Sequence, residues 1–130
     1  MMLPCEVAVK ILIPPTRAAI AKELIMRHGL KQAEAARLLG VSQPAISLYN
    51  RRMRGKAINL EDDLEIRKLI VEFADNLARK SFSQRDYILR FCEICKKARA
   101  KKLLCKMHKS LDSSFDVDNC DFCAEALKCL

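Results

Sequence analysis

Apolar residues recur at helical spacing along most of this chain. Between about 60 and 80 they occupy positions i, i+3, i+4, i+7 and i+11, which predicts a helix with one buried face, formed by Ile66, Leu69, Ile70, Phe73 and Leu77. The period-two alternation of a strand is confined to residues 7–13. Glycine and proline, which interrupt helices, number only three and four. We therefore expect an all-α fold.

Prolines and capping residues divide the first part of the chain. Pro14 and Pro15 are expected to end the segment at 7–13, whether it is a strand or a short helix. Thr16 is the predicted amino-terminal cap of the next helix, and Gly29 is predicted to close that helix.

Two more caps are predicted further on. Asn59 precedes the helix at 60–80, whose first turn is acidic and so suits the positive end of the helix dipole. Ser83, with Asp86 three residues later, predicts the start of another helix that runs through Cys95. The chain is therefore expected to divide near residues 55–60 and again near 81–83.

The densest motif is "QAEAARLLGVSQPAISLYNR" at 32–51, which matches the helix-turn-helix pattern position by position. Ala36 is small where the second helix crosses the first, and Gly40 suits a left-handed turn. Ser42 is the predicted cap of the second helix, with Pro44 in its first turn, where a missing N–H costs nothing. The positions expected to face the core or fill the angle between the helices are Leu39, Val41 and Ile46.

The second helix of this motif, about 43–50, is the predicted recognition helix, entering the major groove of DNA with its amino-terminal end first. Gln43 is the best candidate base reader, because a glutamine amide can pair with two atoms of adenine. Gln32 is placed to bind a phosphate at the start of the first motif helix. The predicted DNA-contacting residues, the last four forming a basic rim, are Gln32, Ser42, Gln43, Pro44, Ser47, Asn50, Arg51, Arg52, Arg54 and Lys56.

The charge distribution also favours an anionic partner. The net charge is +8 and the isoelectric point is about 9.3. The first 60 residues carry ten Lys and Arg against three acids, so the positive charge is concentrated around the motif. The alternatives are a solvated basic face and helix-turn-helix geometry in a protein that does not bind DNA. We favour double-stranded DNA as the partner.

The motif resembles the helix-turn-helix of λ-repressor/Cro-type regulators in bacteria and archaea. Together, "PCEVAVK", "RAAIAKELIMRHGL" and "LGVSQPAISLYNRRMRG" resemble a family of small archaeal helix-turn-helix transcriptional regulators, and the resemblance covers most of the chain. That family also has a cysteine-rich carboxyl-terminal tail of this layout. The resemblance implies transcription regulation and a metal or iron–sulfur tail.

The carboxyl-terminal part of the chain carries three pairs of potential metal ligands at the same spacing. A separation of three residues places both members of a pair on one face of a helix. Cys5 and Cys129 are expected to pack in the core. The candidate ligands, in order of preference, are Cys92, Cys95, Cys120 and Cys123, then Cys105, then His108.

Several chemistries fit these cysteines. An iron–sulfur cluster is favoured, because surplus thiolates accompany a predicted DNA-reading motif, as in a sensor of redox or cluster status. Structural zinc is the main alternative, although Lys96 and Ala124 stand where zinc knuckles usually have a turn-forming residue. A disulfide switch without metal and simple apolar packing of Cys92 and Cys95 stay open. The intervening "KKARAKK" (96–102) is expected to be a solvated helical face, with a phosphate contact as the alternative.

Other classes of protein fit the sequence poorly. No apolar stretch approaches the roughly 18 residues of a membrane helix, and no signal peptide is apparent. We therefore expect a cytoplasmic protein with reduced cysteines and no membrane partner. No catalytic constellation or small-molecule substrate site is evident, so an enzyme is not expected.

These features combine into one prediction. The chain is expected to hold a helix-turn-helix DNA-binding domain (1–58), an amphipathic linker or dimerisation helix (59–82) and a cysteine-rich metal-binding module (83–130). A homodimer is expected, because two recognition helices one DNA turn apart read a palindromic operator. The alternative function is a DNA-binding regulator whose structural zinc site serves as a protein-interaction adaptor.

Overall fold

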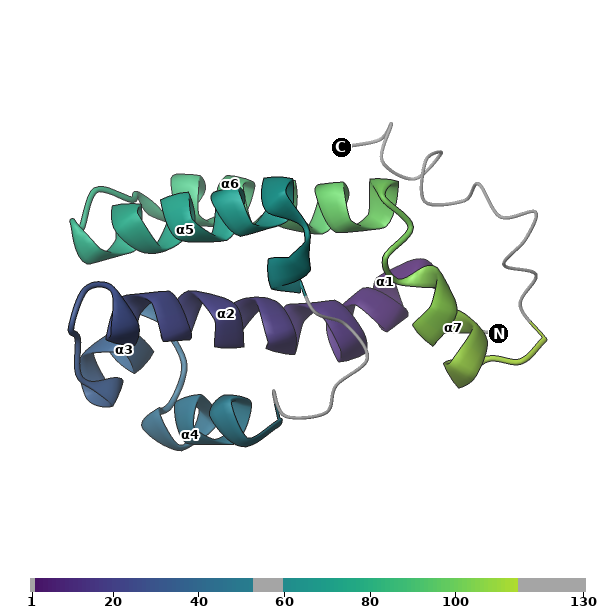
Figure 1. Cartoon of the computed structure of the whole chain (residues 1–130), viewed down its shortest axis with the longest axis horizontal. Coiled ribbons are helices and arrows are strands. Elements are labelled where there is room, and N and C mark those ends of the chain that lie inside the picture. The colour runs from purple at the N-terminus through teal and green to yellow at the C-terminus, as the bar shows by residue number, and fades with distance from the viewer. Residues whose placement is uncertain (1, 53–59, 115–130) are drawn as a thin grey trace.

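The structure, a computed structural model, describes residues 2–52 and 60–114 (Figure 1). Within these ranges all regular structure is helical, which confirms the all-α prediction. No helix in the same ranges is both long enough and apolar enough to span a membrane. The elements are α1 (Pro4–Val7), the π-helical η1 (Ala8–Leu12), α2 (Ile13–Met26), α3 (Gln32–Leu39), α4 (Gln43–Arg52), the 3₁₀ turn η2 (Leu60–Asp62), α5 (Leu64–Ala78), α6 (Gln84–Ala100) and α7 (Cys105–Leu111).

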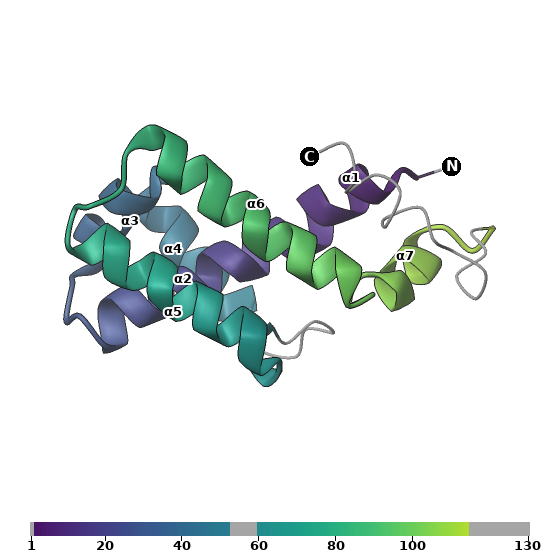
Figure 2. The same ribbon diagram turned by 90° about the horizontal axis from the view of Figure 1, so that it is seen from above.

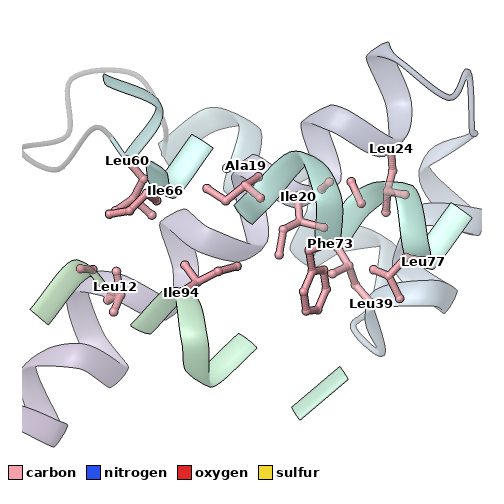
Figure 3. Packing of buried hydrophobic residues seen from close by; sticks show 14 of the residues in the cluster. Leu12, Ala19, Ile20, Leu24, Leu39, Leu60, Ile66, Phe73, Leu77 and Ile94 are labelled. Carbon is pink, nitrogen blue, oxygen red and sulfur yellow. The ribbon is translucent and has the colours of Figure 1, made fainter. Parts of the chain in front are cut away.

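Helix α2 is the central element, and it contacts α3, α4 and α5. The antiparallel pair α5 and α6 lies on one side of α2, with α4 on the other (Figure 1). Helices α3 and α4 are at one end of the molecule, and α1 and α7 meet at the other end (Figure 2). One hydrophobic core runs between these layers and joins α2 to α3, α4, α5 and α6 (Figure 3).

The buried face of α5 is the one that its apolar spacing predicts. Ile66, Ile70, Phe73 and Leu77 are all at most 5% exposed, and Leu69 is partly buried beside them. The Phe73 ring is surrounded by three aromatic rings in edge-on contact, at centroid distances of 5.0 to 5.8 Å, from Phe82, Tyr87 and Phe91. The apolar face of α5 is thus used inside the chain.

The amino-terminal helices differ from the prediction. Pro14 and Pro15 do not end the preceding segment, because α2 begins at Ile13 and continues through both prolines. A proline in the first turn of a helix loses no hydrogen bond, since the first N–H groups of a helix have no partner within it. Thr16 is not a cap either: it is fully buried, and its hydroxyl donates to the Leu12 carbonyl at 2.8 Å. The segment at 7–13 is helical rather than a strand.

The start of α5 also differs from the prediction, whereas the start of α6 agrees with it. Asn59 lies outside the described residues, and the cap of α5 is Asp63, whose carboxylate accepts from the N–H groups of Glu65 (3.0 Å) and Ile66 (3.1 Å). Ser83 caps α6 as predicted, accepting from the Asp86 N–H at 3.1 Å. Helix α6 passes through Cys95 to Ala100.

Helices α3, α5 and α6 end in the same backbone motif. Each is followed by a residue in the left-handed conformation, with φ of 74° at Gly40, 56° at Lys80 and 59° at Lys102. In each case the next N–H bonds to the carbonyl five residues earlier, at 3.0 to 3.1 Å. Only the first of these residues is the glycine that favours such a conformation, so two lysines adopt a strained backbone.

Candidate nucleic-acid interface and cysteine cluster

Gly40 and Ser42 have the roles between α3 and α4 that the sequence predicts. Gly40 turns the chain in the left-handed conformation, and the Ser42 hydroxyl then caps α4 by accepting from the Ala45 N–H at 3.2 Å. Leu39 and Ile46, 3% and 0% exposed, anchor the two helices in the core. These contacts fix the angle at which α4 leaves the turn.

The opposite face of α4 is open to solvent. Gln43 and Pro44 are exposed in its first turn, Leu48 is 42% exposed, and together with Ser47 they line one shallow hollow. The Ser47 hydroxyl donates to the Gln32 side-chain oxygen at 3.2 Å, so a polar bridge joins the first turn of α3 to α4. Four of the predicted DNA contacts therefore lie together: Gln32, Gln43, Pro44 and Ser47.

The basic end of the predicted interface is only partly described. The backbone of α4 is helical through Arg52, which extends the predicted recognition helix by two residues. The structure does not describe the side chains of Asn50, Arg51 and Arg52. Arg54 and Lys56 lie outside the described residues. Their DNA-binding roles stay predictions.

The "KKARAKK" segment is not simply a solvated face. Ala98 is buried and Arg99 is 6% exposed. Lys97 pairs with Glu65 at 3.1 Å, and Lys101 pairs with Asp63 at 3.0 Å. The Lys101 ammonium, helped by the backbone N–H groups at the cap, holds the pKa of Asp63 below its ordinary value. Part of the positive charge of α6 therefore holds the start of α5.

A hydrogen bond that sequence reasoning missed joins α6 to the α3–α4 turn. The Tyr87 hydroxyl donates to the Leu39 carbonyl at 2.8 Å, one residue before Gly40. Burial raises the pKa of Tyr87, so its hydroxyl keeps the proton that it donates. No local pattern signals this contact, because 48 residues separate the two partners.

Cys92 and Cys95 lie one turn apart on α6, as predicted. Cys92 is exposed, whereas Cys95 is half-buried against the core and accepts a hydrogen bond from Arg99. Burial raises the pKa of the Cys95 thiol, and the Arg99 guanidinium opposes that rise.

The expectation that Cys5 packs in the core is wrong. Val7 and Ala8 take the buried positions of the amino-terminal helical segment, at 1% and 5% exposure, and Cys5 is exposed. The helical turn between Cys5 and Ala8 leaves the thiol on the outer side.

The other candidate ligands on the described part of the chain are on α7. Cys105 is half-buried at its start. His108 is 4% exposed, and its Nε2 is hydrogen-bonded to the Met2 carbonyl at 2.8 Å. The Met2 N–H in turn donates to the Asp112 carboxylate at 3.0 Å. His108 therefore helps to dock the amino-terminal segment on α7, a role that its spacing from Cys105 did not indicate.

The described residues do not by themselves form a complete metal centre. Across 2–52 and 60–114, no three His, Cys, Asp or Glu side chains are gathered so as to hold an ion. Cys120 and Cys123, two of the preferred ligands, lie outside the described residues, as does Cys129. A four-thiolate site would need Cys92 and Cys95 to be joined by cysteines from elsewhere in the chain.

The two candidate sites are at different ends of the molecule. The exposed face of α4 belongs to the end formed by α3 and α4, and Cys5 belongs to the end formed by α1 and α7 (Figures 1 and 2). Helix α6 connects them, with Tyr87 at the turn and Cys92 and Cys95 further along. Compared with protein-family models, with curated proteins and with solved structures, the chain has no match in any of the three.

Proposed function

We propose that this protein is a cytoplasmic, sequence-specific transcriptional regulator that binds double-stranded DNA through a helix-turn-helix formed by α3 and α4. The supporting observation is the construction of α4. Its inner side is anchored by the fully buried Ile46, while Gln43 is exposed in the first turn beside the Ser42 cap. A polar amino-terminal end held on a rigid turn suits base readout in the major groove.

The polar contacts suggest how α4 is oriented on DNA. Because the Gln32 oxygen accepts from Ser47, the amide nitrogen of Gln32 can donate to a phosphate at the start of α3. Gln43 can then offer its amide to adenine N6 and N7. The basic residues that follow, Arg51, Arg52, Arg54 and Lys56, would neutralise phosphates and make affinity depend on salt.

A homodimer is part of the proposal. Two copies of α4 about 34 Å apart would occupy successive major grooves on one face of a palindromic operator. Analytical ultracentrifugation with and without the selected operator tests this part. A single protomer bound to a half-site would contradict it.

The cysteine-rich part is proposed to bind an iron–sulfur cluster, with structural zinc as the alternative. Its connection to DNA binding would run along α6, which carries both Cys92 and Cys95 and the Tyr87 that bonds to the turn. An absorption spectrum of anaerobically purified protein separates the two metals. A broad band near about 400 nm supports the cluster, and a colourless protein with stoichiometric zinc supports the alternative.

Selection of binding sites from random duplex DNA tests the main proposal. The full chain should enrich one palindromic sequence, and Gln43→Ala should weaken binding to it by about 5- to 150-fold, the value of one base contact. Gln84→Ala is the matched control, since Gln84 is an exposed glutamine in the first turn of α6. The proposal fails if no sequence is enriched, or if both variants lose the same affinity.

A further inference from the structure

The open face of α4 carries two parallel stripes of side chains. Gln43 and Ser47, one helical turn apart, form a polar stripe. Pro44 and Leu48, also one turn apart, form an apolar stripe beside it. These four residues line the same shallow hollow. The apolar stripe is separate from the core, because Ile46 occupies the buried side of this helix at 0% exposure.

Leu48 is the residue of this face to which the helix-turn-helix pattern assigned no role. It is 42% exposed, so an apolar group of a partner that covers it lowers the free energy of the complex. Because the neighbouring stripe of Gln43 and Ser47 is polar, the matching surface must place an apolar group beside hydrogen-bonding groups. In the major groove of DNA the 5-methyl group of thymine is that apolar group, and it lies among the donors and acceptors of the base edges.

We propose that Leu48, supported by Pro44, recognises the 5-methyl group of a thymine in the operator. This inference rests on the DNA-binding part of the proposed function and adds a specificity-determining residue to it. Gln43 would recognise adenine by hydrogen bonds to N6 and N7, whereas Leu48 would distinguish thymine from cytosine by apolar contact. Each half-site of the operator is therefore expected to contain A·T pairs at both positions.

The geometry of α4 limits where this thymine lies. Leu48 follows Gln43 by five residues, which is about 7.5 Å along the helix axis. Successive base pairs are about 3.4 Å apart, so the thymine is expected within about two base pairs of the adenine that Gln43 contacts. The buried Ile46 and the hydrogen bond from Ser47 to Gln32, at 3.2 Å, hold α4 in place, so this offset is fixed by the fold.

Replacement of thymine by deoxyuridine tests the inference, because uracil lacks only the 5-methyl group and keeps every hydrogen-bonding group. The full chain first selects its operator from random duplex DNA. Fluorescence anisotropy then measures the dissociation constant for duplexes in which one thymine of each half-site is replaced. One of these replacements should weaken binding of the unaltered chain by about 3- to 10-fold per half-site. Leu48→Ala should bind the thymine duplex and the uracil duplex equally.

Leu111→Ala is the matched control. Leu111 is 43% exposed, but it lies on α7, at the end of the molecule away from α3 and α4 (Figure 2). This variant should keep the full preference for thymine over uracil. Leu48→Met keeps a long apolar side chain and should retain most of the preference. Circular dichroism checks that each variant is folded, and both alanine and methionine are good helix formers.

The outcomes separate this inference from the function on which it rests. If an operator is selected but its half-sites contain no thymine, or no uracil replacement weakens binding, the inference is wrong while DNA recognition stands. The inference is also wrong if Leu48→Ala loses the same affinity for the thymine and the uracil duplexes, because the variant then keeps the preference. If no sequence is selected at all, the proposed function and the inference both fail.

Discussion

The hydrogen bond from Tyr87 to Leu39 can be removed with almost no change in shape. Tyr87→Phe deletes the hydroxyl that donates to the Leu39 carbonyl at 2.8 Å but keeps the ring, whose centroid lies 5.1 Å from that of Phe73. A neutral, partly buried hydrogen bond contributes about 1 kcal/mol to the free energy of unfolding. For a chain of 130 residues, that corresponds to a fall in Tm of about 3–5 °C.

Tyr87→Leu separates the hydroxyl from the ring. It removes both the hydrogen bond and the edge-on contact with Phe73, so the expected loss is about 2–3 kcal/mol. Urea unfolding followed by circular dichroism measures both variants, and equal slopes against urea show that the unfolded states are comparable. The reasoning is refuted if Tyr87→Phe is as stable as the unaltered protein, or if it loses as much stability as Tyr87→Leu.

Two further predictions concern helix ends. Because the folded state depresses the pKa of Asp63, its carboxylate should stabilise the protein above the ordinary aspartate pKa of about 3.9 and progressively less below it. Asp63→Asn keeps a good cap but loses the charge that pairs with Lys101, so its Tm should be lower than that of the unaltered protein near neutral pH. This difference in Tm should disappear as the pH falls below about 3.9. A difference in Tm that does not depend on pH would contradict the explanation. Lys80→Gly should raise the free energy of unfolding by about 0.5–1 kcal/mol by relieving the positive φ, measured by urea unfolding. Lys80→Ala, which keeps the strain, should give no such gain, and equal effects of the two changes would count against the explanation.

The features that the sequence predicted correctly are local ones. Gly40 and the Ser42 cap need only their neighbours to fix the turn, and the Ser83–Asp86 box starts α6 in the same way. The buried face of α5 follows from helical periodicity alone. The turn at Gly40 and the cap at Ser42 were therefore predictable from the residues around them.

The features that the sequence did not predict depend on contacts between residues far apart in the chain, or on residues whose local preferences conflict. Pro14 and Pro15 indicate a break, yet the π-helical turn before them lets a new helix begin immediately. The exposure of Cys5 follows from how the amino-terminal segment docks on α7, which no spacing rule encodes. Two lysines adopt the left-handed conformation, so composition alone could not mark the ends of α5 and α6.

Helix α6 carries both Tyr87 and Cys95, so the helix sets the distance between these two residues. Eight residues at about 1.5 Å each separate them along the helix axis by about 12 Å. A paramagnetic ion held by the cysteines would stand at a fixed offset from the Leu39–Gly40 turn, within range of its magnetic effect on nearby nuclei. Nuclear magnetic resonance of the backbone amides at that turn would then report whether α6 moves as a rigid rod when DNA or metal binds.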